Sequence, residues 1–192
     1  MNFPGGPGRN SSDGPVRPRV ADHSFDHDVL AAARPNPAKL ALTGARNGRD
    51  SVRVYATLTN SGWGHSMPTG NDQNLVLLRI RALDADGKIP WENDPFSEWS
   101  VSIFGLVLAD ELGTWPADTW NAIKILSDRR IKAGGSARVR YDIPTAGAKA
   151  PIVVQAHALY RQSKPQTLEA YGLSEEQYGR ERSLAEAVAK IP

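Results

Sequence analysis

The stretch DSVRVYATLTN, residues 50–60, alternates apolar and polar side chains with a period of two. On an extended chain its apolar positions would share one face, and these positions are Val52, Val54, Ala56 and Leu58. Such alternation is typical of a strand that buries one face and exposes the other. The stretch therefore predicts a β-strand packed on one side against a core.

Further strand candidates lie on both sides of residues 50–60, separated by Gly, Pro and Asp turn signals. They are residues 39–43, 73–84, 88–91, 101–108, 121–126, 137–143 and 151–161. The run from Asp84 to Gly87 suits a tight hairpin turn because Asp and Gly tolerate its backbone angles. About seven or eight short strands with such turns predict a mostly β protein, an antiparallel β-sandwich.

The two ends of the chain differ from this central pattern. Residues 1–22 are poor in apolar side chains and predict a flexible N-terminal arm, and residues 25–34 predict a brief helical or irregular stretch that ends at Pro35. Near the other end, the sequence from Ser174 to Gln177 has the form of a capping box. The apolar positions that follow approximate one helical stripe, and they are Tyr178, Leu184, Ala185, Val188 and Ile191.

These patterns predict an arm over residues 1–22, a β-sandwich domain over 23–163 and a C-terminal helical tail over 164–192, with a helix to about Lys190. The first twenty residues lack the apolar region of a secretory signal, as expected of an intracellular chain or of a mature or truncated piece. No stretch approaches the roughly 18 apolar residues of a membrane span.

The composition excludes several classes of site. The 192 residues include no cysteine, which excludes disulfides, zinc-thiolate and iron–sulfur sites, and thioether attachment of haem. The 23 Lys and Arg against 21 Asp and Glu give a net charge of only +2, too small an excess to predict a nucleic-acid partner. No Gly-x-Ser-x-Gly elbow and no phosphate-binding glycine loop occurs, so we expect no hydrolase or nucleotide site.

The four histidines are the main candidates for ligands. His23 and His27 stand four apart, which on a helix would give metal-ligand spacing, but a pair alone does not specify a metal. His157 would share a strand face with Gln155 and Leu159, where a histidine usually bonds a neighbour or water.

His65 lies in the loop NSGWGHSMPTG, residues 60–70, which packs three glycines and a proline around it. Glycine permits positive φ and close backbone approach, and proline stiffens the chain, so the loop can present the imidazole from a defined position. Two interpretations remain open at this point. His65 either bonds a backbone carbonyl to hold the loop or serves as a ligand.

The pattern Asn-x-Gly-x-Gly-His-x-x-Pro-Thr-Gly resembles a loop in the β-sandwich module of multihaem c-type cytochromes. It is made here by Asn60, Gly62, Gly64, His65, Pro68, Thr69 and Gly70. Upstream, His23-Ser24-Phe25 resembles the family's His-x-Phe, whose histidine can serve as a distal axial haem ligand. Downstream, residues 127–131, 141–144 and 159–161 resemble the family's next turn and strands, so the resemblance covers about residues 20–170.

The resemblance implies a non-catalytic accessory subunit or module of a periplasmic or extracellular electron-transfer complex. Family members carry Cys-x-x-Cys-His segments and this chain has none, so no haem is expected to be attached to it covalently. The partner would be a multihaem c-type cytochrome, and the cofactor would be the haem of that partner. His23, or in its place His65 or His27, would then donate an axial ligand in trans. The chain could equally be a haemless derivative or a fragment of such a cytochrome.

Two other classes of function stay open on the sequence. A free-standing carbohydrate-binding sandwich would use Asn93, Asp94, Trp99, Trp115 and Asp118. A small metalloprotein would use His23, His27 and His65 with an Asp. The five tryptophans either form a binding face or plug the ends of the sandwich, and they are Trp63, Trp91, Trp99, Trp115 and Trp120.

Overall fold

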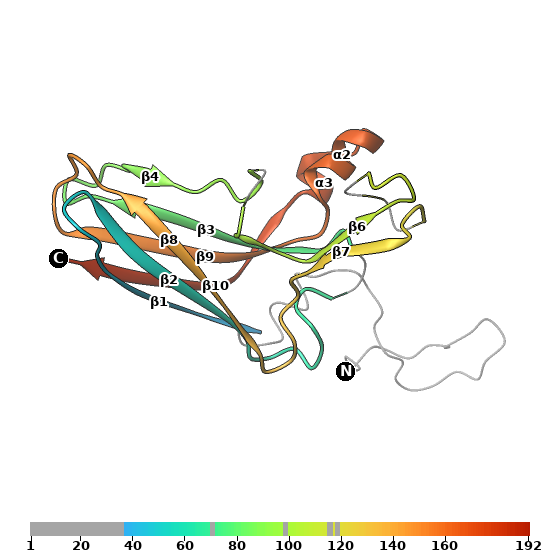
Figure 1. Cartoon of the computed structure of the whole chain (residues 1–192), viewed down its shortest axis with the longest axis horizontal. Helices are drawn as coiled ribbons and strands as arrows, with labels where there is room; N and C mark the ends of the chain where they lie inside the picture. Colours follow the sequence, from blue (N-terminus) through green and yellow to red (C-terminus); the bar gives the residue numbers. More distant parts are fainter. Residues whose placement is uncertain (1–36, 70–71, 98–99, 115–116, 118–119) are drawn as a thin grey trace, which may run out of the picture. The chain divides into compact units, whose positions relative to one another are not determined.

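The computed structural model describes residues 37–69, 72–97, 100–114, 117 and 120–192. The predicted arm 1–22, the stretch 25–34 and the pair His23 and His27 lie outside the described residues, as do Gly70, Trp99, Trp115 and Asp118. The described part from residue 37 onward forms a β-sandwich (Figure 1).

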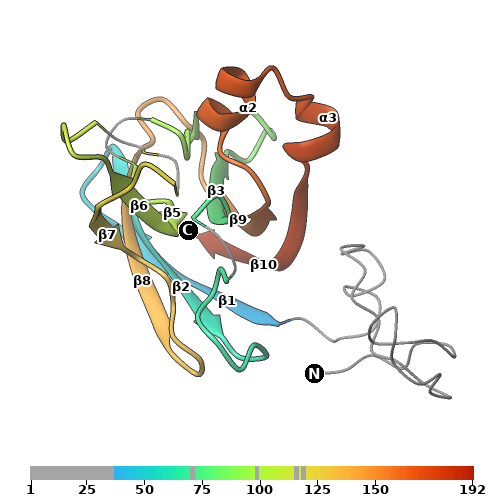
Figure 2. The ribbon, with the colours of Figure 1, turned by 90° about the vertical axis from the view of Figure 1, so that its right-hand side faces the viewer.

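The sandwich is built from two antiparallel sheets, seen end on in Figure 2. The first sheet has the order β1 (Ala38–Arg46), β2 (Ser51–Asn60) and β8 (Ser136–Pro144). The second has the order β10 (Glu181–Ile191), β9 (Ile152–Arg161), β3 (Leu75–Leu83) and β4 (Trp91–Glu92), and β5 (Ile103–Phe104) also pairs with β3. A separate two-stranded sheet consists of β6 (Leu106–Ala109) and β7 (Lys124–Asp128).

The core lies between the inner faces of the two large sheets. The predicted inward face of β2 is fully buried, with Val52, Val54, Ala56 and Leu58 at 0% exposure. The second sheet contributes alternate apolar residues to the same cluster, chiefly Ile80, Ile152, Val154 and Ala156. Burial of one face of each sheet against the other is the sandwich arrangement, so the predicted fold class is confirmed.

The predicted turn after β3 is confirmed in detail. Gly87 has φ +76° and its amide donates to the Asp84 carbonyl at 3.0 Å. The Asp84 carboxylate accepts the amides of Asp86 and Lys88 at 2.9 and 3.0 Å. The strand that follows begins at Trp91 and not at residue 88, and the predicted strand 101–108 is divided into β5 and β6.

The predicted helix to about Lys190 is wrong. The capping box does start a helix, because the Ser174 side chain accepts the Gln177 amide at 3.3 Å, but α3 (Glu175–Tyr178) ends at Gly179. Residues 181–191 form β10, which pairs antiparallel along β9. Pairing satisfies the backbone groups of an otherwise open sheet edge, and this tertiary gain overrides the helix propensity of an alanine-rich segment.

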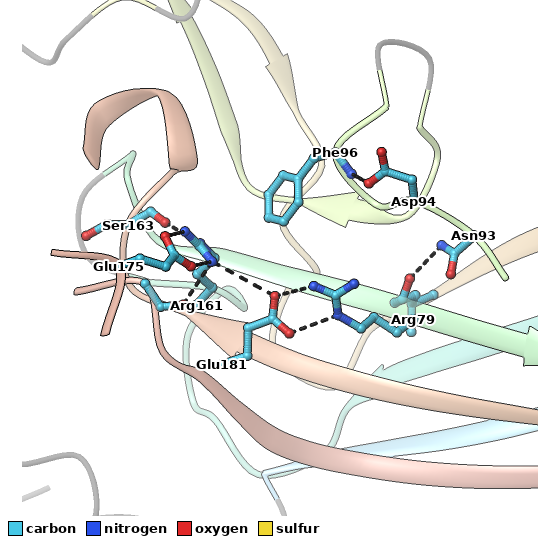
Figure 3. A network of polar contacts seen from close by, with 10 residues as sticks. Arg79, Asn93, Asp94, Phe96, Arg161, Ser163, Glu175 and Glu181 are labelled. Atoms are coloured by element: carbon cyan, nitrogen blue, oxygen red, sulfur yellow. Dashed lines mark hydrogen bonds and ion pairs between the residues drawn. The ribbon is translucent and has the colours of Figure 1, made fainter. Parts of the chain in front are cut away.

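Figure 1 shows β6, β7, α2 (Pro165–Tyr171) and α3 at the same end of the sandwich. Arg161, at the end of β9, anchors the segment of α2 and α3 there (Figure 3). Its guanidinium, only 4% exposed, donates to both carboxylate oxygens of Glu175 at 2.6 and 2.7 Å and to the carbonyls of Ser163 and Gly179 at 2.6 and 2.9 Å. No helix in the described part of the chain is long and apolar enough to cross a membrane.

Candidate functional site

Two segments that the sequence analysis singled out separately meet in space at one end of the sandwich. The loop after β2, which we call the His65 loop (residues 60–69), is bound to the turn after β7, residues 128–135. Met67 and Ile131 exchange both backbone hydrogen bonds at 2.8 Å, and the Asn60 amide and carbonyl bond to Gly135 and Gly134 at 3.0 Å. The loop is therefore held at both ends by a turn about 70 residues away in sequence.

Asn60 organises the inside of the His65 loop. Its side chain is fully buried. The amide nitrogen Nδ2 donates to the carbonyls of His65 and Ile131 at 2.7 and 3.1 Å, and Oδ1 accepts the Trp63 amide at 3.2 Å. One side chain thus fixes the path of the loop on both sides of Gly64.

The two described glycines of the loop have different roles. A Cβ on Gly62 would lie 2.8 Å from the Cα of Pro37, so the backbone approaches too closely for any side chain. A Cβ on Gly64 would meet nothing within 4 Å. Neither glycine has positive φ, so of the two properties that glycine permits, the loop uses the close backbone approach, at Gly62.

Beyond the histidine, the loop returns to the body of the domain. Pro68 is buried together with Met67, and the peptide bond between them is cis. Thr69 is exposed, and its carbonyl accepts a hydrogen bond from the side chain of Asn74. These contacts fix the return of the loop to β3.

His65 is exposed near the tip of the loop. Its Nδ1 lies 3.1 Å from the Ser66 carbonyl oxygen, and because a carbonyl only accepts, Nδ1 carries the proton in this contact. The lone pair of the neutral imidazole is then on Nε2, as in histidines that ligate metals through Nε2 with Nδ1 bonded to a carbonyl. The two interpretations from the sequence are therefore compatible, since one nitrogen holds the loop and the other is left for a ligand.

Trp63 lies between the imidazole and the body of the domain. Its ring centroid is 5.9 Å from that of His65 and 6.5 Å from that of Tyr160, which it meets edge to face at 87°. Trp63 is half-buried and packs against the core. Burial raises the pKa of the Tyr160 phenol, so Tyr160 contributes packing and not charge near neutral pH.

The turn that holds the His65 loop is itself fixed by a charged pair. Asp128 accepts the backbone amide of Arg130 at 3.1 Å and its guanidinium at 2.9 and 2.8 Å. The Arg130 guanidinium holds the pKa of Asp128 below its usual value. Gly134, with φ +70°, closes the turn. The pattern Asp-x-Arg-Ile followed by Gly in the sequence therefore corresponds to a well-defined turn beside the loop.

The other sequence candidates lie elsewhere or are already bonded. His157 is on the outer face of β9, as predicted, with Nδ1 3.4 Å from a Glu186 oxygen. The Asn93 side chain accepts the Ile80 amide at 2.6 Å and donates to the Leu78 carbonyl and the Ser102 hydroxyl at 2.9 and 2.8 Å. Asn93 is thus occupied in holding its own segment to β3, which does not favour the carbohydrate-binding alternative.

The tryptophans divide between packing and exposure. Trp63 and Trp91 pack against the core, and Trp91 meets Tyr141 edge to face at 6.2 Å. Trp120 is 70% exposed and contacts Tyr171 of α2 at a centroid distance of 6.0 Å. Of the described tryptophans, only Trp120 therefore offers most of its surface to a partner.

The residues that position this end of the domain were not predictable from the sequence. Arg161 was quoted only as part of a closing strand, yet it fixes α2 and α3, and Arg79 binds Glu181 through two hydrogen bonds of 2.9 and 2.6 Å in the same network (Figure 3). Lys164 and Asp72 form a buried pair at 3.4 Å. A cation at the end of an apolar strand was the only available signal, because the partners are distant in sequence.

Two tests bear on a metal or haem site. Within the described ranges, no group of three or more His, Cys, Asp or Glu side chains could hold a metal ion. His65 offers a single exposed imidazole with its Nε2 lone pair directed away from the Ser66 bond, and the chain has no cysteine to attach haem. One exposed imidazole can supply at most one axial ligand to an iron, and a chain without cysteine cannot hold haem through thioether bonds.

Comparison with known proteins finds a solved structure with a similar fold. No protein-family model matches the chain, and no curated protein matches it. Among solved structures, the chain is similar to the penta-heme cytochrome c552 from Thermochromatium tepidum, with a TM-score of 0.69 and 23% identity, covering 95% of this chain and 48% of that chain. The chain thus spans about half the length of that cytochrome, and the two share the fold of the matched half.

Proposed function

We propose that this protein is a non-catalytic subunit or module of a multihaem electron-transfer complex, which docks on a haem-bearing partner. The observation that supports it most is the shared fold over 95% of this chain with part of a penta-heme cytochrome, in a sequence without one cysteine. A domain of this fold that cannot attach haem provides a surface that binds the partner, and the redox centres belong to that partner. We place the complex in the periplasm or outside the cell by the same resemblance.

The His65 loop supports a more specific role within this proposal. Asn60, Trp63 and the 128–135 turn hold the loop, and the Nδ1 bond to Ser66 leaves Nε2 for a ligand. An imidazole held in this way loses little conformational freedom when it binds iron, which favours binding. His65 would then complete the coordination of a partner's haem. His23 and His27, which lie outside the described residues, are the other candidates for this ligand.

Co-purification tests the proposal itself. The chain, tagged at its own locus, is purified from its cells, and the co-eluting polypeptides are separated on a denaturing gel and stained for haem. We expect a haem-stained polypeptide in fixed ratio to an unstained chain. Elution of the chain with no haem-stained polypeptide would refute the proposal.

Histidine variants of the complex test ligation in trans. His23→Ala, His27→Ala and His65→Ala are compared with His157→Ala, whose imidazole faces Glu186 on the sheet surface and serves as a matched control. Loss of an axial ligand is expected to shift the haem spectrum and the reduction potential in one of the three test variants and not in the control. Unchanged spectra and potentials in all three would exclude a trans ligand while leaving the docking role intact.

A further inference from the structure

A cavity of about 420 Å³ is lined by residues of β3, β5, β6 and α2. Figure 1 shows β6 and α2 at one end of the sandwich. A volume of this size is typical of sites that hold small organic ligands. Large apolar side chains make up half of the lining, and they are Leu75, Phe96, Ile103, Leu106 and Val107. The cavity can therefore remove the apolar part of a small molecule from water.

Hydrogen bonds and strand pairing fix the walls of the cavity. The Phe96 amide donates to the Asp94 carboxylate at 2.9 Å (Figure 3). The Phe96 ring packs against the anchored guanidinium of Arg161, whose central carbon lies 5.4 Å from the ring centroid. Across the cavity, Ile103 of β5 is paired with Leu77 of β3. Walls that are already ordered lose little conformational freedom when a ligand binds, which favours binding.

Arg129 is the only charged residue among the described residues that line this cavity. It follows β7 directly, and its backbone amide donates to the Gly105 carbonyl at 3.0 Å. Its guanidinium donates from Nη2 to the Val101 carbonyl at 2.7 Å, and its central carbon lies 5.3 Å from the ring centroid of Phe104. Within the described residues, these contacts orient the guanidinium and use one of its five N–H donors.

The charge of Arg129 has no counter-ion in the described ranges of the chain. The adjacent Asp128 carboxylate binds Arg130 through both oxygens. The nearby ammonium of Lys164, which donates to a carbonyl of β6, is paired with Asp72 at 3.4 Å. Arg129 itself is half-buried. A half-buried guanidinium beside apolar side chains is stabilised by an anion, and its planar N–H groups match a carboxylate.

We propose that this cavity binds a small monocarboxylate with an apolar body, a molecule of the medium-chain fatty acid type. The carboxylate accepts hydrogen bonds from Arg129, and the apolar body lies against the apolar lining. Ser100 and Gln166 also line the cavity and offer further hydrogen-bonding groups. Such a site goes beyond the proposed function, because it needs no haem-bearing partner.

Calorimetric titration of the full chain with octanoate tests this site, with octanol and acetate as reference ligands. We expect octanoate to bind at one site. Octanol should bind at least about 10-fold more weakly because it lacks the charge that Arg129 recognises. Acetate should not bind measurably because it has almost no apolar surface to bury.

A pair of arginine variants separates the charge from the cavity. Arg129→Gln keeps a donor for the Val101 carbonyl but removes the charge, so it should bind octanoate at least about 10-fold more weakly and octanol as wild type does. Arg81→Gln is the matched control, because the exposed Arg81 guanidinium also donates a hydrogen bond, to Gln155 at 2.6 Å on the outer face of the second sheet. Its charge is screened by solvent, so its affinity for octanoate should stay within about two-fold of wild type.

Val107→Phe is a second test that does not depend on Arg129. The larger side chain fills part of the cavity and should weaken the binding of octanoate and octanol alike. Melting midpoints equal to that of wild type verify that each variant folds. No binding of octanoate to wild type at about 1 mM, or equal binding by wild type, Arg129→Gln and Val107→Phe, would overturn the site. Equal affinity of wild type for octanoate and octanol would overturn the preference for a carboxylate. None of these results bears on docking to a haem-bearing partner.

Discussion

Replacing Asn60 with alanine is expected to destabilise the domain by about 3 kcal/mol, because three hydrogen bonds of about 1 kcal/mol each are lost. The side chain is fully buried, so its truncation also leaves a small void in its place. Two of the partners lie in the loop, at Trp63 and His65, and water can satisfy them in part. This keeps the expected loss near the sum of the bonds and not above it.

Asn60→Asp separates hydrogen bonding from side-chain volume. The introduced carboxylate has nearly the same shape, but it would face the carbonyl oxygens of His65 and Ile131 with no proton to donate. At pH 7 we expect a loss larger than that of Asn60→Ala, about 4 kcal/mol, because an uncompensated charge is buried.

The same variant has a predictable pH dependence. Burial against two carbonyls raises the folded-state pKa of the introduced carboxyl above its unfolded value of about 3.9. The Asn60→Asp variant is therefore most stable below the unfolded-state pKa of this carboxyl, and it loses that stability as the pH rises through the folded-state pKa. The deficit relative to wild type should shrink toward about pH 4.

Urea unfolding at about pH 7 and about pH 4.5, followed by tryptophan fluorescence, measures these differences. Thr59→Ala is the control: its exposed hydroxyl only contacts Ser136, so a change within about 0.5 kcal/mol is expected. A loss below about 1 kcal/mol for Asn60→Ala, or an Asn60→Asp variant as stable as Asn60→Ala at neutral pH, would refute the role given to Asn60.

Three further predictions concern the same end of the domain. Gly62→Ala should lower the free energy of unfolding by about 1–3 kcal/mol because the added Cβ meets the Pro37 backbone. Gly64→Ala places its Cβ in open space and should be neutral or slightly stabilising. A Gly62→Ala variant as stable as wild type would contradict the close approach to Pro37. Arg161→Lys should lower the free energy of unfolding by about 2–3 kcal/mol and speed proteolysis within residues 163–179, because one ammonium group cannot replace the four hydrogen bonds of the guanidinium. An unchanged rate of cleavage in this segment would contradict the anchoring role of Arg161. The hydrogen bond from Arg161 lowers the pKa of Glu175 in the folded protein. The stability that this ion pair contributes is therefore present above the ordinary glutamate pKa and is lost as the pH falls through the pKa of Glu175 in the folded state. The acid-unfolding curves of wild type and Glu175→Gln should converge at low pH, and parallel curves would argue against this contribution.

The fold was predictable where apolar and polar residues alternate clearly along a strand. The alternation from Val52 to Leu58 identified β2 because burial against the second sheet imposes a period of two. The Asp84 to Gly87 turn was predictable for a local reason, the preference of glycine for positive φ. The helix N-cap at Ser174 was also predictable, because the capping-box residues are close together in sequence.

Features that depend on distant partners were not predictable. The segment 181–191 has a composition that suits a helix, and only its pairing with β9 makes it a strand. The contact between Met67 and Ile131 likewise joins parts of the chain that no spacing rule connects. For the candidate site, the sequence identified His65 and its glycines, but the role of Asn60 and the anchor at Arg161 follow from three-dimensional contacts.

The measurement that tests the account most directly is sedimentation velocity of the natively purified protein, recorded at both the protein and the haem absorbance. The account predicts that the chain sediments in one species heavier than its own 20.8 kDa and that this species absorbs at both wavelengths. A colourless species of the mass of the chain alone, with haem absorbance absent or in a separate boundary, would contradict it.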